Sequence, residues 1–310
     1  MKTLITGGAG FVGSHLVDKL IKEGQSVVIV DDLSTGKKEN VNSEAKFYQL
    51  DIQSPEIENV FLAEKPEIVF HLAAQVDLRK SVESPIENAK INILGSLNVL
   101  ENCRKFGVKK IIFASSGGVI YGEAEKIPTS ESALEAPLSP YGVEKLAVEK
   151  YLKFYRKSFG LSSISLRFAN IYGPRQNSKG ESGVVAIFTD KILNGESPII
   201  YGEGNQTRDY LYVEDAVSAL SESGREQFSA ASGIFNVGTG QETSVDEIYE
   251  IIAGKTNQEI EPKKEAEKKG DLQRSCLNCS LIKKELNWEP KFNLEEGLEK
   301  TINWFRTKIS

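Results

Sequence analysis

A tyrosine and a lysine stand four residues apart in segment 139–145, whose sequence is SPYGVEK. The segment begins a helical pattern that runs to about Phe159, so the spacing places Tyr141 and Lys145 on one helix face. A free tyrosine titrates near pH ~10, and an ammonium beside it favours the phenolate. The pair therefore suits acid–base catalysis. By itself such a pair is more often a solvated helix face, so its meaning depends on what precedes it.

Two serines end the strand expected at Lys109–Ser115, in the sequence Ser115-Ser116-Gly117. The carboxyl end of a strand borders the crevice in which α/β sheets bind ligands. A hydroxyl there can hydrogen-bond the same substrate oxygen that Tyr141 deprotonates. The alternative interpretation is a serine-glycine turn without a chemical role.

A glycine-rich loop follows the first expected strand and has the sequence GGAGFVG, with glycines at Gly7, Gly10 and Gly13 and with Phe11 and Val12 before the last. An amphipathic stretch follows, so the glycines permit a tight turn and close approach of a pyrophosphate to a helix amino end. The second strand ends at Asp31-Asp32, where a carboxylate binds the ribose of NAD and repels the 2′-phosphate of NADP. A bound nicotinamide cation would add to the effect of the lysine and bring the tyrosine near neutrality as a general base. The alternative is a glycine turn that serves packing alone.

The elements around these residues alternate between β-branched runs and helical patterns, which is typical of βαβ units and a parallel sheet. Beyond about residue 170 the pattern loosens into short elements, which indicates a smaller, loop-rich region. We expect residues 1–170 to form one α/β domain, with 211–240 returning to it, and 171–210 with 241–310 to form the second region. The expected strands are Lys2–Thr6, Ser26–Asp31, Lys46–Leu50, Glu67–Leu72, Lys109–Ser115 and Ser232–Val237.

Composition excludes several classes of protein. The 310 residues include 38 basic and 44 acidic side chains, so no broad positive charge favours nucleic acid. No apolar run approaches the roughly 18 residues that span a membrane. The apolar stretch at the amino terminus is too short for the core of a signal peptide, so we expect a cytoplasmic protein. Cys276 and Cys279 have CxxC spacing, but a zinc site needs about four ligands and histidine is scarce. We expect no metal and two ordinary thiols near a helix start.

Taken together, the motifs resemble the extended short-chain dehydrogenase/reductase family, and specifically its nucleotide-sugar 4-epimerases. The resemblance covers essentially the whole chain. It implies a Rossmann-type doubly wound parallel sheet that holds NAD, with a smaller, loop-rich α/β domain that holds a nucleotide diphosphate sugar. The motifs, in chain order, are the glycine loop, Asp31-Asp32, Asp51-Ile52, HLAAQ at 71–75, NILG at 92–95, Ser115-Ser116, Tyr121-Gly122, Tyr141 with Lys145, LRFANIYGP at 166–174, Arg208-Asp209-Tyr210 and Gly270-Asp271.

The resemblance also implies roles for single residues. Those expected along the cofactor are Asp51 and Ile52 beside the adenine, Leu72, Ala73, Ala74, Gln75 and Ser115 along its path, and Phe168 near the nicotinamide. Those expected at the nucleotide sugar are Asn170 and Arg208 at the diphosphate, Tyr201 near the uracil and Asp271 near the ribose.

The chain departs from the family pattern at two positions. Gly117 occupies the place where relatives often have serine or threonine, so we expect Ser116 to be the catalytic hydroxyl, with Ser115 as the alternative. Lys268 stands where many relatives have arginine, and lysine lacks the bidentate fork, so Arg274 is a further candidate for the phosphates.

The implied reaction is the 4-epimerisation of a UDP-hexose through a transient 4-keto sugar and NADH, with Tyr141 as the base. The resemblance also implies that the position of Ser275 helps to set the size of the sugar pocket, and with serine there we expect room for the 2-acetamido group of UDP-GlcNAc. The three residues that follow Ser116 are Gly117, Gly118 and Val119. At these positions, related dehydratases carry acids for further proton transfers.

Two other classes stay open. One is a nucleotide-sugar 4,6-dehydratase or another enzyme of the family with net product change, and the other is an NAD-binding regulator without turnover. The regulator is disfavoured because it needs neither Tyr141 nor Lys145. By resemblance, the helical segments Pro85–Phe106 and Ser139–Phe159 pair across a two-fold axis, so a homodimer is expected.

Overall fold

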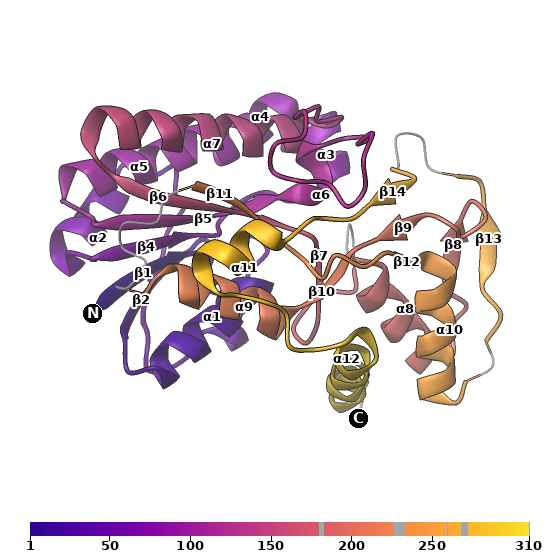
Figure 1. Ribbon diagram of the computed structural model, residues 1–310. Coiled ribbons are helices and arrows are strands. Elements are labelled where there is room, and N and C mark those ends of the chain that lie inside the picture. The colour runs from indigo at the N-terminus through magenta and orange to yellow at the C-terminus, as the bar shows by residue number, and fades with distance from the viewer. Residues whose placement is uncertain (180–182, 226–232, 259, 268–271, 310) are drawn as a thin grey trace.

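A parallel sheet of seven strands forms the centre of the computed structural model (Figure 1). The structure describes residues 1–179, 183–225, 233–258, 260–267 and 272–309. Along the sheet the order is β11-β6-β5-β4-β1-β2-β3, and every neighbouring pair runs parallel. The strands are β1 (Lys2–Thr6), β2 (Ser26–Asp31), β3 (Lys46–Gln49), β4 (Ile68–His71), β5 (Lys110–Ser116), β6 (Ser162–Phe168) and β11 (Gly233–Val237). This confirms the predicted α/β class with a Rossmann-type sheet.

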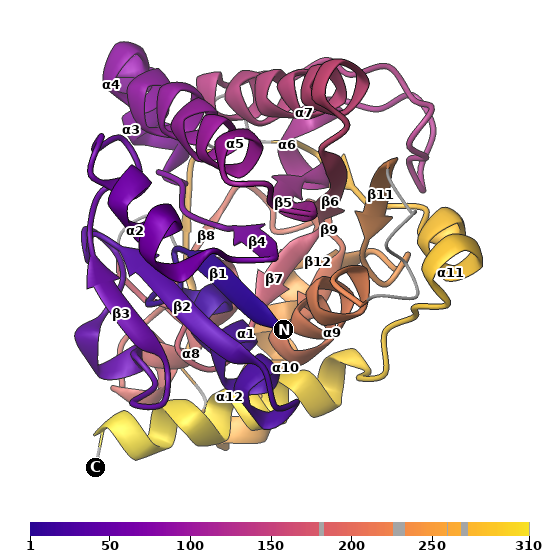
Figure 2. The same ribbon diagram turned by 90° about the vertical axis from the view of Figure 1, so that its left-hand side faces the viewer.

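Helices cover both faces of the sheet because successive strand residues point to opposite sides. In β1, Leu4 packs with α2 (Ile57–Glu64), α5 (Ser96–Lys105) and α7 (Pro140–Phe159). Its neighbour Ile5 packs on the other side. The helices on that side are α1 (Phe11–Lys22), α9 (Val213–Ser223) and α11 (Ser280–Leu286). The end-on view shows α5 and α7 on one side of the strands and α1 and α9 on the other (Figure 2).

The segment expected as one helix over Pro85–Phe106 has a wider turn in its middle. It consists of α4 (Pro85–Ala89), a π-helix (Lys90–Gly95) and α5, and a short α3 (Leu78–Glu83) precedes it. A π-helical turn inserts one extra residue per turn and is frequent at functional sites. It cannot be recognised from apolar spacing alone, which explains why the sequence predicted an uninterrupted helix.

Shorter elements build the remainder of the chain. Three small sheets pair β7 (Asn170–Tyr172) with β10 (Tyr210–Tyr212), β13 (Lys263–Glu265) with β8 (Ile199–Tyr201), and β12 (Thr243–Ser244) with β9 (Thr207–Arg208) and β14 (Arg274–Ser275). The other helices described are α6 (Gly117–Ile120), α8 (Val184–Leu193), α10 (Val245–Thr256), α12 (Leu294–Ile309) and a 3-10 turn (Lys38–Asn40).

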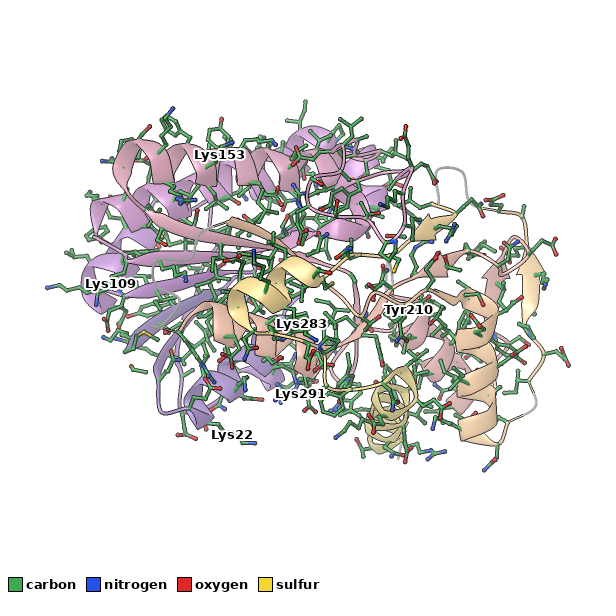
Figure 3. All side chains as sticks on the ribbon, in the orientation of Figure 1. Lys22, Lys109, Lys153, Tyr210, Lys283 and Lys291 are labelled. Atoms are coloured by element: carbon green, nitrogen blue, oxygen red, sulfur yellow. The ribbon has the colours of Figure 1, made fainter. Side chains whose placement is uncertain are left out.

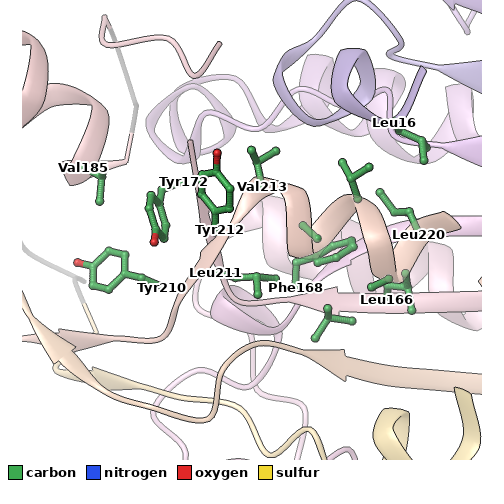
Figure 4. Packing of buried hydrophobic residues seen from close by; sticks show 14 of the residues in the cluster. Leu16, Leu166, Phe168, Tyr172, Val185, Tyr210, Leu211, Tyr212, Val213 and Leu220 are labelled. Carbon is green, nitrogen blue, oxygen red and sulfur yellow. The ribbon is translucent and has the colours of Figure 1, made fainter. Parts of the chain in front are cut away.

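One apolar cluster joins these elements to the main sheet. Figure 4 shows Phe168, at the end of β6, near Leu211 and Val213, with Tyr172 and Tyr212 farther along the same cluster. Because these residues belong to one cluster, the ends of β6 and β7 are packed together with β10. None of the helices in the described part of the chain is long and apolar enough to cross a membrane.

Candidate active site

The first turns of α7 position Tyr141 and Lys145. Pro140 begins the helix, and the side chain of Ser139 caps it by accepting a hydrogen bond of 3.1 Å from the N–H of Gly142. Lys145 Nζ donates a hydrogen bond of 2.7 Å to the carbonyl of Ala114 in β5. The same ammonium lies 5.6 Å from the centroid of the Tyr141 ring, so the two side chains share a face as expected.

Burial dominates the acid–base properties of this pair. It lowers the pKa of Lys145 to about 8, although the carboxylates of Glu144 and Glu149 act in the opposite direction. Burial also raises the pKa of Tyr141 above its ordinary value, and the charge of Glu144 adds to that effect. In the chain without a cofactor, removal of the phenol from water thus outweighs the neighbouring ammonium. The expectation that this ammonium and a nicotinamide cation together bring Tyr141 near neutrality stays a prediction.

The two serines of β5 face opposite sides. Ser115 Oγ donates a hydrogen bond of 2.6 Å to Glu149 Oε1, whose carboxylate also accepts from Nε of the fully buried Arg167 at 3.0 Å. Ser116 lies on the side of Asn170, since a Cβ atom on Gly118 would be 4.0 Å from Ser116 Oγ and 3.5 Å from Asn170 Oδ1. The side chain of Ser115 is thus engaged in a buried ionic network. Ser116 instead points toward the side of Asn170, which is the residue expected at the diphosphate.

Residue types and spacing did not predict that network. Arg167 Nη2 contacts Glu149 Oε2 at 2.6 Å and Glu135 Oε1 at 2.5 Å, and its Nη1 donates to the hydroxyl of Tyr121 at 2.9 Å. Glu149 stands four residues after Lys145, on the buried stripe of α7. Two features of the sequence could have indicated the network. One is a charged residue four positions after Lys145 in the helix, and the other is an arginine inside an apolar strand.

Leu277 explains why glycine occupies position 117. A Cβ atom on Gly117 would lie 2.7 Å and 2.8 Å from the two Cδ atoms of Leu277, which is 2% exposed. A serine at this position would collide with that side chain. The neighbouring Cys276 is buried, which raises the pKa of its thiol to about 12, and Cys279 directly precedes α11. No group of three or more potential metal ligands occurs among the residues that the structure describes.

The glycine-rich loop fits a dinucleotide. Gly7 has a φ of +74°, and a Cβ atom on it would lie 2.7 Å from the backbone nitrogen of Ala73. A Cβ atom on Gly13 would lie 2.1 Å from the carbonyl oxygen of Gly7. Only glycine permits this packing. Helix α1 begins at Phe11, so Gly13 lies in its first turn, and the first N–H groups of the helix have no partner within it. Ala73 N donates to Thr6 Oγ1 at 3.2 Å, which holds the Leu72–Ala74 segment beside the loop.

Asp31 and Asp32 are placed differently. Asp31 is 6% exposed, and its carboxylate accepts from the backbone N–H of Ala9 and of Leu33, each at 2.9 Å. Burial raises its pKa, and the two N–H donors oppose that rise. Asp32 is exposed and accepts from the N–H of Ser34. Asp31 is therefore the acid directed at the phosphate loop, and the residues present fit NAD.

A network of amides joins the cofactor side to α7. The side chain of Asn92, in the π-helix, accepts from the N–H of Gln75 at 2.8 Å and donates to its carbonyl at 2.9 Å. Asn92 Nδ2 also donates to Glu144 Oε2 at 2.7 Å. Gln75 is thus held in place by the π-helix, Lys90–Gly95, which the sequence predicted as part of an uninterrupted helix.

Other expected cofactor residues occupy positions compatible with their assignment. Ile52 is buried, and its side chain lies where a Cβ atom on Gly95 would be. The carboxylate of Asp51 accepts a hydrogen bond from the N–H of Gln53. Phe168 ends β6 directly beside Ser116 in the strand register.

The substrate candidates are only partly brought together. Ser275 pairs with Arg208 in the register of β14 and β9, so their side chains share one face of that small sheet. Arg274 pairs with Thr207 on the opposite face, where its Nε donates to Glu242 Oε1 at 3.0 Å. Alternation along the strand therefore turns Arg274 away from Arg208, and its expected role at the phosphates stays a prediction.

A cavity of about 580 Å³ lies beside Tyr201, and Gln206, Lys264 and Gln273 also line it. Asn170 begins β7 and is exposed. Asp271 and Lys268 lie outside the described residues.

Comparison with known proteins identifies the family. The model of the NAD dependent epimerase/dehydratase family matches residues 3–238. A UDP-glucose 4-epimerase from Mycolicibacterium smegmatis is 42% identical over 99% of both chains. The crystal structure of a UDP-glucose 4-epimerase with UDP-glucose from Thermotoga maritima covers 100% of both chains at 47% identity, with a TM-score of 0.97.

A third relative has a different named substrate. It is a UDP-N-acetylglucosamine 4-epimerase from Methanobrevibacter ruminantium, 35% identical over 99% of this chain and 98% of its own, with a TM-score of 0.93. With the match to the family model and the glycine loop, Tyr141 and Lys145 in place, this chain belongs to the NAD dependent epimerase/dehydratase family.

Proposed function

We propose that this protein is an isomerase that interconverts UDP-glucose and UDP-galactose by NAD-dependent inversion at C4 of the hexose. The observation that carries the proposal is the placement of Tyr141 and Lys145 on one face of α7, next to the end of β5 that carries Ser116. The named activities of the relatives in Mycolicibacterium smegmatis and Thermotoga maritima support it.

The proposed chemistry assigns one task to each group. NAD, when bound by the glycine loop and Asp31, supplies a hydride acceptor and donor for C4. Tyr141 takes the proton of the 4-hydroxyl and later returns it, and Ser116 hydrogen-bonds the same oxygen. Lys145, held by the carbonyl of Ala114, places its positive charge beside the phenol. After the oxidised sugar turns about its bond to the diphosphate, the hydrogen returns to C4 from the other face.

The residues after Ser116 favour epimerisation over dehydration. A 4,6-dehydratase must also move protons at C5 and C6, which requires further acid–base groups. Gly117, Gly118 and Val119 have none, and the side chain of Leu277 fills the space beside Gly117. No side chain at these three positions is able to perform the additional steps.

The nucleotide end of the substrate is assigned to the smaller sheets. Such a cycle needs a firm grip on the nucleotide and a loose grip on the hexose, which must turn. We assign Arg208 and Asn170 to the diphosphate, and Tyr201 with the cavity beside it to the base. In this assignment residues 1–170 and 211–240 bind the cofactor, and 171–210 with 241–310 bind the nucleotide sugar.

Ser275 supports acceptance of N-acetylated sugars. It shares a face with Arg208 and is too small to close the sugar pocket. We therefore expect the chain to epimerise UDP-GlcNAc as well, as the name of the relative in Methanobrevibacter ruminantium suggests. The ratio of kcat/KM for UDP-GlcNAc to that for UDP-glucose tests this, and a Ser275→Tyr variant should lower the ratio. Undetectable turnover of the acetamido sugar by the parent enzyme would contradict it.

Exposed apolar side chains support a homodimer. They cluster on α7 and on the neighbouring segment from α3 to the π-helix, at Val82, Ile86, Leu94, Val143, Tyr151 and Phe154. Contiguous apolar side chains of this kind mark association surfaces. Sedimentation analysis should show a dimer that a Phe154→Glu variant weakens. A cytoplasmic location belongs to the same proposal.

Incubation with UDP-galactose tests the main proposal. Direct analysis of the products should show turnover that stops at an equilibrium mixture of UDP-galactose and UDP-glucose. Accumulation of an unsaturated or 4-keto product would favour the dehydratase, and absence of turnover with NAD still bound would favour a regulator. A panel of uridine, thymidine and guanosine diphosphate sugars then identifies the preferred base.

A further inference from the structure

The peptide of Ala9, in the middle of the phosphate loop, is held on one side by the last residue of β2 and on the other by residues that follow β2. Its N–H donates to Asp31 Oδ2 at 2.9 Å. Its carbonyl accepts from the backbone N–H of Lys37 at 3.0 Å and from Asn40 Nδ2 at 3.2 Å. The segment 32–40, here called the ribose loop, is therefore fastened to the phosphate loop. Within the loop, the side chain of Asn40 makes this connection through its hydrogen bond to the carbonyl of Ala9.

Gly36 lets the ribose loop close over the carboxylate of Asp31. A Cβ atom on Gly36 would lie 2.6 Å from Asp31 Oδ1, 3.0 Å from Oδ2 and 3.1 Å from the Cβ atom of Ala9. A contact below 3.0 Å requires something to move, and the carboxylate is the group that meets it first. An alanine at this position would displace the loop or turn Asp31 away from Ala9.

The carboxylate of Asp31 is therefore fixed in direction before any ligand arrives. Both of its oxygens accept backbone hydrogen bonds, from Ala9 and from Leu33. Leu33 has a φ of +63°, in the left-handed region, so the turn that supplies its N–H is itself held in an uncommon conformation. A group that is held in its binding direction avoids the cost of ordering it on binding.

We propose that Asn40 and Gly36 are positioning residues for the cofactor, which hold the ribose loop closed on Ala9 and Asp31 and so set affinity for NAD and discrimination against NADP. In a sheet of this type the acid at the end of the second strand binds the ribose hydroxyls. A closed loop keeps the carboxylate of Asp31, and therefore its repulsion of a 2′-phosphate, in a fixed position. The inference rests on NAD as the cofactor and is independent of which sugar is epimerised.

A matched pair of variants tests the role of Asn40. Asn40→Ala removes the hydrogen bond to Ala9, whereas Asn42→Ala removes a comparable bond from Asn42 Nδ2 to Asp18 Oδ1 in α1, only two residues away. We expect Asn40→Ala to raise the dissociation constant for NAD by about fivefold, the effect of one hydrogen bond. Asn42→Ala should leave it within about twofold. Gly36→Ala should weaken NAD by about tenfold or more and narrow the ratio between NADP and NAD affinities.

Two measurements make the result decisive. Isothermal titration with NAD and with NADP gives the affinities, and the release of NAD from the purified holoenzyme on dilution gives its lifetime. Backbone hydrogen exchange without nucleotide should be faster over 32–37 in Asn40→Ala and unchanged there in Asn42→Ala.

Unaltered NAD affinity and protection in Asn40→Ala would overturn the proposal. Equal loss of affinity in Asn42→Ala would also overturn it, because only general loop stability would then matter. If the parent chain itself does not bind NAD, the cofactor assignment fails rather than this role of Asn40. Turnover of the sugar enters none of these readouts.

Discussion

Replacing the buried lysine of the active site should make the protein more stable while it abolishes turnover. Lys145 is 4% exposed, and burial lowers its pKa to about 8 from an ordinary value of 10.5. Its ammonium is therefore destabilising where it stands, even with Glu144 and Glu149 nearby. Lys145→Met keeps the length of the side chain and removes the charge. Buried charges that serve catalysis commonly reduce stability in this way.

The size of the effect follows from the pKa of Lys145. Each pKa unit corresponds to about 1.4 kcal/mol, so the lowered pKa means that the buried ammonium reduces the free energy of unfolding by about 3 kcal/mol at pH 7. The lost hydrogen bond to the carbonyl of Ala114 offsets about 1 kcal/mol. We expect the variant to be more stable by about 2 kcal/mol at pH 7, or roughly 4 °C in Tm for a chain of this size.

The sign of the pH dependence is fixed by linkage. Between pH 8 and 10.5 the folded protein has released the proton of Lys145 and the unfolded chain still holds it, so the parent gains stability as the pH rises. The cost of about 3 kcal/mol at pH 7 falls to about 1 kcal/mol at pH 10, and the advantage of the variant disappears there.

Thermal unfolding of parent and variant at pH 7 and pH 10, without added nucleotide, measures this difference. Lys153→Met is the matched control, because Lys153 is on the outer face of the same helix and is exposed (Figure 3). That control should show no advantage that depends on pH. A Lys145→Met variant that melts below the parent at pH 7, or whose difference from the parent is the same at pH 10, would refute the reasoning.

Three further predictions concern the same site. Tyr141→Phe should lower kcat by about a thousandfold with NAD still bound, and near-parental turnover would contradict its role as the base. Ser116→Ala should lower kcat by about a hundredfold, whereas Ser115→Ala should mainly lower Tm, since it removes a buried hydrogen bond to a carboxylate; the reverse pattern would exchange their roles. Gly117→Ala should destabilise the protein by about 1–3 kcal/mol in thermal unfolding, and adding Leu277→Ala should relieve part of that loss; additive effects would show that the two positions do not compete for space.

Local patterns predicted the sheet well. The strands at Lys2–Thr6 and Ser26–Asp31 have the predicted bounds, and those predicted at Lys46–Leu50, Glu67–Leu72 and Lys109–Ser115 differ by one residue at one or both ends. Strand β11 is found as predicted from Gly233 to Val237, whereas β6 (Ser162–Phe168) was not predicted. Apolar runs flanked by turn formers determine such elements locally. The π-helical turn at Lys90–Gly95 escaped prediction because its cause is tertiary, in the contacts of Asn92 with Gln75 and Glu144.

The site was predictable where residue type and spacing are sufficient. Helical spacing placed Tyr141 beside Lys145, but the choice between Ser115 and Ser116 needed the partner of each hydroxyl. Glu149 lies beyond the Tyr-x-x-x-Lys spacing, and its contact with Arg167 joins two segments that are distant in sequence. The direction of the Arg274 side chain was not predictable either, because it depends on the register of a two-residue strand. The balance between burial and charge at Tyr141 likewise follows from packing.

The most direct test of the proposed function follows carbon-bound hydrogen while the enzyme converts UDP-galactose in deuterated water. If the proton held by Tyr141 comes only from the 4-hydroxyl and the hydrogen of C4 returns to C4, the UDP-glucose formed has no deuterium on carbon by NMR and mass spectrometry. Deuterium at C4 or C5 of the product, or a product that has lost water, would contradict the account.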